Sequence, residues 1–239
     1  MNLSRVTWYA MAAALAAAAL FARLGFWQLD RLHERQAFNA QLHARLAAAP
    51  VPVGVLPPDT AAGHYHRVTA RGRFDYAAQV ALAARSSQGS PGVHLLTPLR
   101  LDDGRTVLVN RGWVYAPDGK TVDGTKWRDR NGDSVQVSGY AETWVGLETV
   151  PLPPEQRVVR TLDSAAVARL VGTPIFPYYI AQTSDSARGP DRPVRLGEPI
   201  LDDGSHFSYA VQWFSFALIA LIGGALLVRQ ERARRRASA

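Results

Sequence analysis

The chain has 239 residues and no cysteine, with 27 lysines and arginines against 20 aspartates and glutamates. Without cysteine it cannot hold a disulfide framework, a thiolate zinc site, an iron–sulfur cluster or a covalently attached c-type haem. The formal net charge of +7 is concentrated near the two ends, and residues 229–239 alone hold five arginines and one glutamate. Because a nucleic-acid-binding domain carries its basic excess on its folded surface, this distribution predicts no nucleic-acid partner.

Two long uncharged segments lie near the ends of the sequence. Residues 6–22 form a run of 17 residues without a charge, and residues 207–228 form a run of 22. At a rise of about 1.5 Å per residue, the second run spans roughly 33 Å, which is enough to cross a hydrocarbon core of about 30 Å. We predict transmembrane helices over 6–27 and 206–228. A cleaved secretory signal peptide is the alternative for the first segment.

Basic residues flank both segments on their terminal sides. Arg5 lies in the short segment 1–5, and the arginine-rich tail occupies 229–239. The positive-inside rule therefore predicts that both termini are cytoplasmic and that the residues between the helices lie outside the cytoplasm. The simplest interpretation of the tail is a stop-transfer anchor rather than a lipid- or RNA-binding segment. No transit-peptide-like leader precedes the first run, which favours a bacterial inner membrane over a mitochondrial one.

The segment that follows the first helix changes character twice. Residues 28–49 contain neither glycine nor proline and repeat apolar residues at helical spacing, which predicts a helical stalk. Residues 50–63 are rich in proline and are predicted to form an extended linker. Residues 64–205 then alternate short apolar runs with turn signals, which is typical of a β-rich domain.

Within that domain, seven strands are predicted, at 66–74, 79–85, 93–101, 106–114, 134–142, 157–162 and 178–182. Turns are predicted at 89–92, 102–104, 118–119 and 131–132. One short helix is predicted over 164–171, capped by Asp163 or Ser164 and closed by Gly172. The expected fold is a membrane protein in which two transmembrane α-helices flank a mainly β extracytoplasmic domain, an antiparallel barrel or sandwich, with a helical stalk and one short helix.

The sequence carries no motif of a known catalytic class. It contains no nucleophile elbow, no glycine-rich phosphate loop and no zinc-protease motif, so we expect that it is not an enzyme. His64 and His66 would share one face of a strand and could reach a metal ion. No third ligand lies near them in the sequence, which disfavours a metal site there.

Arg111 lies near the end of the predicted strand 106–114, in the sequence Val109-Asn-Arg-Gly-Trp113. In a structural role, Gly112 would permit a bulge or a close approach of another segment, and Arg111 would pair with a carboxylate. In a functional role, the guanidinium would bind carboxylates such as those of haem propionates. The residues alone favour the structural role.

His206 opens the second transmembrane segment. On a helix it shares a face with Tyr209 and Trp213, which follow at i+3 and i+7. A neutral imidazole is a good ligand for haem iron, and an aromatic face would suit a porphyrin. The alternative is an interfacial histidine within an aromatic belt, and the residues alone favour that alternative.

Four motifs in this order resemble the surfeit locus protein 1 family of cytochrome c oxidase assembly factors. They are Leu24-Gly-Phe-Trp27-Gln28 followed by Arg31, Gly92-Val-His-Leu-Leu-Thr-Pro98-Leu, Val107-Leu-Val-Asn110-Arg111-Gly112-Trp113, and His206-x-x-Tyr209-Ala-x-Gln-Trp213. Together with the two terminal helices they cover nearly the whole chain. The departures are small, since Tyr115-Ala116 replaces an expected proline and Gly204-Ser205 replaces an asparagine-rich segment before the histidine.

This resemblance implies an assembly factor that assists maturation of the haem a sites of cytochrome c oxidase subunit I by binding haem a transiently. It implies that His206 is an axial ligand of the haem iron, that Tyr209 and Trp213 shape the pocket, and that Arg111 contributes to a propionate contact. The implied partners are subunit I, haem a synthase and membrane lipid. The alternative function is a haem-independent membrane scaffold for subunit I or haem a synthase. Without the resemblance, an external sensor or binding module would be favoured.

Overall fold

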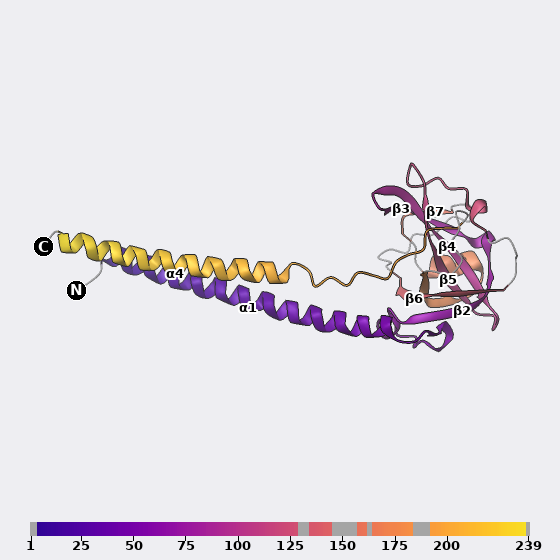
Figure 1. Cartoon of the computed structure of the whole chain (residues 1–239), viewed down its shortest axis with the longest axis horizontal. Helices are drawn as coiled ribbons and strands as arrows, with labels where there is room; N and C mark the ends of the chain where they lie inside the picture. The colour runs from indigo at the N-terminus through magenta and orange to yellow at the C-terminus, as the bar shows by residue number, and fades with distance from the viewer. Residues whose placement is uncertain (1–3, 129–133, 145–156, 162–163, 184–191, 238–239) are drawn as a thin grey trace. The chain divides into compact units, whose positions relative to one another are not determined.

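The chain divides into two compact units, which we call the helix pair and the barrel unit (Figure 1). The helix pair comprises Met1–Gln41 and Leu201–Ala239, and the barrel unit comprises Leu42–Ile200. A computed structural model describes residues 4–128, 134–144, 157–161, 164–183 and 192–237. The two ends of the sequence therefore fold together, and the β-strands belong to the other unit.

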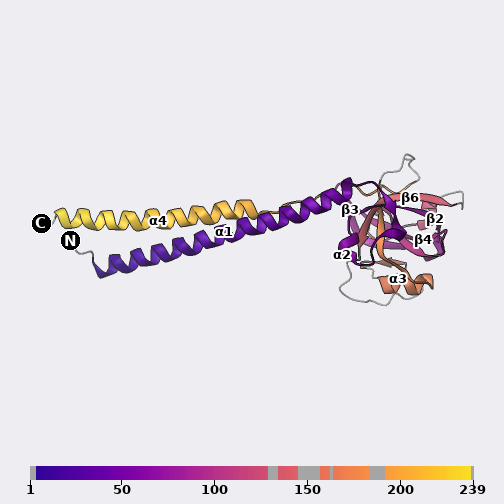
Figure 2. The same ribbon diagram turned by 90° about the horizontal axis from the view of Figure 1, so that it is seen from below.

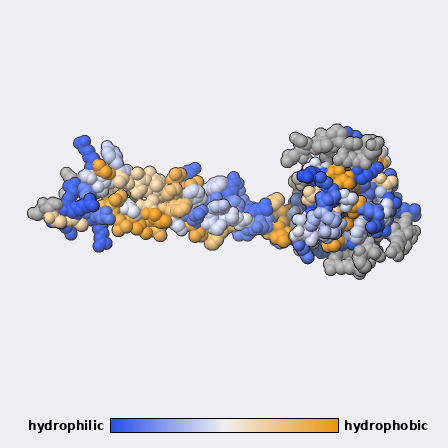
Figure 3. Space-filling model, turned by 90° about the horizontal axis from the view of Figure 1, so that it is seen from above, coloured by the Kyte–Doolittle hydropathy of each residue, from blue (hydrophilic) through white to orange (hydrophobic). Residues whose placement is uncertain are grey.

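Two long helices, α1 (Arg5–Ala47) and α4 (His206–Ala237), provide the transmembrane segments. Both are long and apolar enough to cross a membrane by length and composition, in agreement with the two predicted segments. Their large apolar side chains are mostly exposed, for example Leu20 and Ile219. In the space-filling view, an apolar band runs along the helix pair and gives way to polar surface toward the chain ends (Figure 3). Such a band is the surface that a lipid environment requires.

The two helices lie side by side over the N-terminal part of α1 (Figures 1 and 2). Aromatic rings connect them along this contact. The ring of Trp213 stacks on Phe21 with a centroid separation of 5.8 Å, and Phe214 meets Phe26 edge-on at 5.1 Å. Aromatic pairs at these separations add attraction beyond the area that they bury, so they help to fix the register of α4 against α1.

The predicted helical stalk is the C-terminal part of α1, which continues without a break to Ala47 and ends before Pro50. The predicted linker 50–63 is not a simple extended connection. Its start forms β1 (Val51–Pro52), which pairs in parallel with β2 (Arg67–Phe74), and its end forms the short helix α2 (Thr60–Gly63). Between them Val53 is only 2% exposed and belongs to the barrel core. The apolar residues between the prolines therefore anchor this segment to the domain.

The barrel unit contains six further strands: β3 (Val80–Ser87), β4 (Ser90–Leu101), β5 (Thr106–Tyr115), β6 (Val135–Thr143), β7 (Val158–Val159) and β8 (Ile175–Gln182). They form one sheet in the order β1-β2-β6-β8-β5-β4-β3-β7. An additional pairing between β2 and β4 closes β2, β6, β8, β5 and β4 into a ring, so the expected barrel is confirmed. At Gly72 in β2, a Cβ atom would collide with the Arg100 carbonyl oxygen, so the closure requires glycine there.

The pairing is not antiparallel throughout. Strands β5 and β8 are parallel, as are β1 with β2 and β3 with β7. The predicted short helix, α3 (Ser164–Val171), precedes β8, packs against it and buries Ala166, Val167 and Val171. The barrel core consists of branched aliphatic side chains such as Val68, Leu99 and Ile180, which are fully buried.

Residues 89–92 are not a turn, because Ser90–Gly92 already belong to β4, and the reversal occurs one step earlier at Gln88 and Gly89, both with positive φ. This two-residue turn matches the twist of the strands that it joins. The turn predicted at 131–132 lies outside the described residues, as do Asp163, one of the two suggested caps of α3, and Leu162 of the predicted strand 157–162.

Candidate functional site

His206 is the first residue of α4 and follows a turn that is fixed to α1. Within this turn, the Gly204 N–H donates to the Asp202 side chain at 2.9 Å. Asn39 of α1 donates through its Nδ2 to the carboxylate of Asp203 at 2.9 Å and to the Asp202 carbonyl oxygen at 3.2 Å. Asn39 is only 4% exposed, so these bonds are partly shielded from water. The start of α4 is therefore held in one place along α1.

A second polar contact determines the orientation of the His206 ring. Its Nδ1 lies 2.8 Å from Oε1 of Gln28, a residue of α1 that is only 9% exposed. A carbonyl oxygen can only accept a hydrogen bond, so Nδ1 carries the proton and donates it. In neutral imidazole the other nitrogen, Nε2, then keeps its lone pair. This is the arrangement found in metal-binding histidines, whose second nitrogen donates to a nearby oxygen.

The space beside Nε2 is bounded by Gly204. A Cβ atom at Gly204 would lie 3.5 Å from Cδ2 and 3.8 Å from Nε2 of His206, and Gly204 has a positive φ of 74°. The missing side chain therefore leaves the metal-binding edge of the imidazole less obstructed. In the sequence, Gly204 differs from the asparagine-rich segment expected before the histidine, and in the structure it lies beside the candidate ligand.

Tyr209 and Trp213 differ in their surroundings although both follow His206 on α4. Trp213 packs between the helices, against Phe21 at 5.8 Å and Phe216 at 5.9 Å. Tyr209 is 48% exposed and therefore offers free aromatic surface. Of the two, Tyr209 is the residue that could lie against a flat ligand, while Trp213 stabilises the helix contact on which the position of His206 depends.

Arg111 lies in the barrel unit, at a bulge in β5. Leu95 of β4 faces Gly112 while Leu96 faces Asn110, so Arg111 is the additional residue. Gly112 adopts a φ of 121°, and a Cβ atom there would collide with the backbone oxygen of Val194. The predicted bulge and the predicted close approach at Gly112 are therefore both confirmed.

The side chain of Arg111 is almost completely buried, with 1% exposure. Its guanidinium carbon lies 4.9 Å from the ring centroid of Phe74 and 5.2 Å from that of Tyr76. Two aromatic faces at these distances stabilise a buried cation. Such a side chain holds β5 against the end of β2 and the segment that follows it, and it offers almost no surface to a ligand.

The motif residues of the barrel unit contain a second polar pair that sequence analysis missed. Asn110 of β5, 3% exposed, lies with its Nδ2 3.2 Å from Nδ1 of His94 on β4. Burial, together with the nearby positive charge of Arg85, lowers the pKa of His94 to about 4. His94 is therefore neutral near pH 7, and its Nδ1 accepts a hydrogen bond from the side-chain amide of Asn110. Both residues lie in quoted motifs, and the register of the predicted hairpin could have brought them together.

Among the described residues, no group of three or more histidine, aspartate or glutamate side chains lies close enough together to hold a metal ion, so a site at His64 and His66 gains no support. His64 instead lies with its Nε2 2.6 Å from Glu142 of β6.

Gln28 is the other residue that sequence analysis missed. It stands in a quoted motif, but 178 positions separate it from His206, and only the packing of α4 on α1 brings the two together.

Comparison with known proteins places the chain in a family. The family model described as the SURF1 family matches residues 15–218. An uncharacterized SURF1-like protein of Mycobacterium tuberculosis is 30% identical over 246 residues, which cover 99% of this chain and 89% of the relative. A SURF1-like protein of Rickettsia conorii is 26% identical over 83% of this chain and 82% of the relative. Surfeit locus protein 1 of Rattus norvegicus is 27% identical over 80% of this chain and 66% of the relative. Since the family model and these relatives match most of its length, the chain belongs to the SURF1 family.

Proposed function

We propose that this protein is a membrane-anchored assembly factor for cytochrome c oxidase, which receives haem a and passes it to subunit I. Membership of the SURF1 family, known generally for cytochrome oxidase assembly, supports the broader role. The contact between His206 and Gln28 is the observation that supports the haem a step. Haem a is the cargo in this proposal, and it would supply the redox centre of the mature oxidase.

The residues at the start of α4 fit such a cargo. His206 would hold the haem iron through Nε2, because its Nδ1–H donates a hydrogen bond to Oε1 of Gln28. Gly204 leaves the edge beside Nε2 without a side chain, and Tyr209 offers an exposed aromatic ring. The histidine also stands one residue before an uncharged run of 22 residues. A ligand there could meet a hydrophobic haem that arrives from within the bilayer.

The proposed setting is a bacterial inner membrane with both termini in the cytoplasm and the barrel unit outside. Haem a synthase, which would supply haem a, and subunit I, which would receive it, are the partners in this setting. Reporter fusions at Pro58 and at Ala239 test the orientation, and we expect periplasmic activity only at Pro58. Periplasmic activity at Ala239, or a mature protein that lacks residues 1–22, would contradict it.

The contact with Gln28 is also compatible with a second function. A hydrogen bond between two helices fastens them, and Asn39 with Asp203 does the same nearby. In this alternative, His206 is a structural residue, and the protein is a haem-independent scaffold for subunit I or haem a synthase.

Removal of the imidazole distinguishes the two functions. The full-length protein is purified from haem-a-producing cells as wild type, as His206→Ala, and as the controls His33→Ala and His94→Ala. We expect His206→Ala to retain near-normal abundance but to lose the copurified haem a spectrum and to lower the haem content of the oxidase. His33 is exposed on α1, and we expect both control variants to keep the pigment. If His206→Ala keeps a full haem a spectrum, the scaffold function is favoured instead.

A further inference from the structure

A groove runs between the two helices at the end formed by the first turns of α1 and the last turns of α4. Its volume is about 620 Å³. Most of its lining is apolar and comes from both helices: Met11, Ala14, Leu15, Leu221, Gly224, Ala225, Val228 and Ala233. Leu15 and Leu221 keep 54% and 45% of their surface exposed. The groove belongs to the helix pair alone and lies far along α4 from His206.

Three arginines complete the lining of this groove. Arg229, Arg232 and Arg236 follow one another at i, i+3 and i+7 on α4, so they share one face of the helix. Arg229 is the first charged residue after the uncharged run that ends at Val228. Apart from Ala233, the apolar lining of the groove therefore lies within the two uncharged runs, and the positive charges begin where the second run ends.

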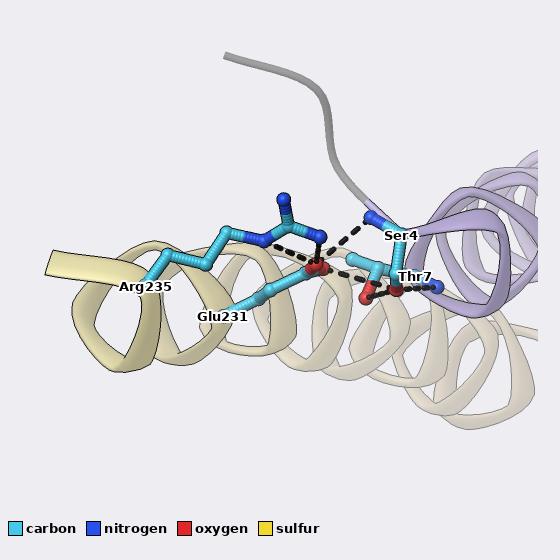
Figure 4. A network of polar contacts seen from close by, with 4 residues as sticks. All are labelled: Ser4, Thr7, Glu231 and Arg235. Carbon is cyan, nitrogen blue, oxygen red and sulfur yellow. Dashed lines mark hydrogen bonds and ion pairs between the residues drawn. The ribbon is translucent and has the colours of Figure 1, made fainter. Parts of the chain in front are cut away.

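Glu231, the one acidic residue of the tail, makes its contacts with groups other than these three arginines. Glu231 accepts a hydrogen bond from the backbone N–H of Ser4 at 2.8 Å and forms an ion pair with Arg235 at 2.7 Å (Figure 4). Ser4 in turn caps α1, since its Oγ accepts the N–H of Thr7 at 3.2 Å. The carboxylate is thus engaged at the N-terminus of α1. Among the residues that the structure describes, none forms an ion pair with the three groove arginines.

We propose that this groove binds one anionic phospholipid from the adjoining leaflet. The headgroup phosphate lies among Arg229, Arg232 and Arg236, and an acyl chain follows the apolar wall of Leu15 and Leu221. Guanidinium groups match phosphate oxygens through paired hydrogen bonds, and basic pockets between transmembrane helices suit acidic headgroups. An apolar channel that ends in positive charge is complementary to an anionic lipid. This site is independent of the haem proposal.

Lipid binding in the groove can be distinguished from general electrostatic attraction to an acidic membrane. If binding came only from general attraction to an acidic membrane, each arginine of the tail would contribute about equally to lipid binding. If the lipid lies in the groove, Arg232, which lines it, contributes more than Arg234, which does not. The charge-matched variants Arg232→Gln and Arg234→Gln are therefore compared in the full-length protein. One arginine near an acidic lipid surface is worth about 1 kcal/mol, which is about fivefold in binding. We expect a fivefold loss for Arg232→Gln and less than a twofold loss for Arg234→Gln.

Binding is measured by native mass spectrometry of the detergent-purified protein with added phosphatidylglycerol. Phosphatidylcholine with the same acyl chains tests the need for negative charge, and inorganic phosphate as a competitor tests the need for the chains. We expect retention of phosphatidylglycerol, much weaker retention of phosphatidylcholine, and no displacement by millimolar phosphate. Displacement by phosphate, or equal retention of the two lipids, would overturn the proposal.

A second pair of variants tests the apolar wall without a change of charge. Ala225→Phe places a ring in the groove, whereas Leu226→Phe alters an exposed neighbour that does not line it. We expect only Ala225→Phe to reduce the retention of phosphatidylglycerol, by about fivefold or more. Equal retention by the two phenylalanine variants, or an equal loss in Arg232→Gln and Arg234→Gln, would show that no lipid occupies this groove.

Discussion

The helix pair and the barrel unit bury different kinds of residue. The barrel unit encloses large apolar side chains such as Leu95, Leu108 and Tyr178, each with at most 1% exposure. In the described part of the helix pair, the buried residues are small or polar: Ala18, Gly25, Gln28, Asn39, Ala210, Ala217 and Gly224. Burial of apolar area from water stabilises the barrel, whereas close packing and hydrogen bonds hold the helices together in lipid.

This difference determines what a buried polar residue does in each unit. Arg111 is enclosed by aromatic rings within the barrel unit, so its loss should weaken the fold. Gln28 lies between two helices and orients His206, so its loss should change the site more than the fold. The predictions below test this contrast, beginning with the largest expected effect.

Arg111→Ala should destabilise the barrel unit by about 3–5 kcal/mol, because it removes a large, fully buried side chain and leaves a cavity beside Phe74 and Tyr76. That is a large part of a typical stability of about 5–15 kcal/mol, so the abundance of the protein should fall. The matched control is Arg105→Ala, because Arg105 also lies over an aromatic ring but its side chain is 52% exposed. If Arg111→Ala had normal abundance but lost its haem, Arg111 would instead be a haem-binding residue.

Gly112→Ala should destabilise the barrel unit by about 3 kcal/mol. The φ of 121° is strained for any residue with a Cβ atom, and that atom would meet the Val194 backbone. Gly197→Ala is the control, since nothing lies within 4 Å of a Cβ atom there and no positive φ is involved. Denaturant midpoints of the two variants give the comparison, and equal midpoints would mean that the bulge does not require glycine.

The stability of the barrel unit should fall as the pH is lowered from about 6.5 to about 4. The folded-state pKa of His94 is lowered to about 4 by burial and by Arg85, whereas the unfolded chain takes up this proton near pH 6.5. The unfolded state therefore binds more protons within this window, and up to about 3 kcal/mol is lost across it. His94→Gln should flatten this part of the stability profile. A profile that is equally steep in the variant would exclude His94 as its cause.

Gln28→Leu should weaken haem a retention by about tenfold, because hydrogen-bond partners of metal ligands typically contribute 10–100-fold to affinity. The helix pair should still insert, since leucine suits a helix contact in lipid. Gln41→Leu, an exposed position on α1, is the control and should retain haem a as the wild type does. Equal retention in both variants would mean that Gln28 does not orient the ligand.

Local patterns accounted for most of the elements. The apolar runs, the turn at Asp102–Gly104 and the helix Ser164–Val171 all depend on neighbouring residues, and the structure agrees with each of them. Pairings between distant segments were not predictable in this way. The closure of β2 on β4, the parallel pairing of β5 with β8 and the docking of Val53 all depend on which surfaces meet after folding.

The candidate site shows the same limit. His206 and Tyr209 could be chosen from their position on a helical face, and Gly112 as a glycine inside a predicted strand. The partner of His206 could not be chosen, because many polar residues of α1 could face α4 until the register of the helices is known. The aromatic contacts of Phe21 and Phe26 fix that register, and with it the contact of Gln28 with His206.

The most direct test of the central claim replaces the imidazole by a different iron ligand. The absorption and resonance Raman spectra of haem a bound to full-length His206→Met are compared with those of the wild type. If His206 binds the iron, replacement by a thioether must change the axial-ligand signature and lower the amount of bound haem. An unchanged signature at full occupancy would show that another residue, or none from this chain, binds the iron.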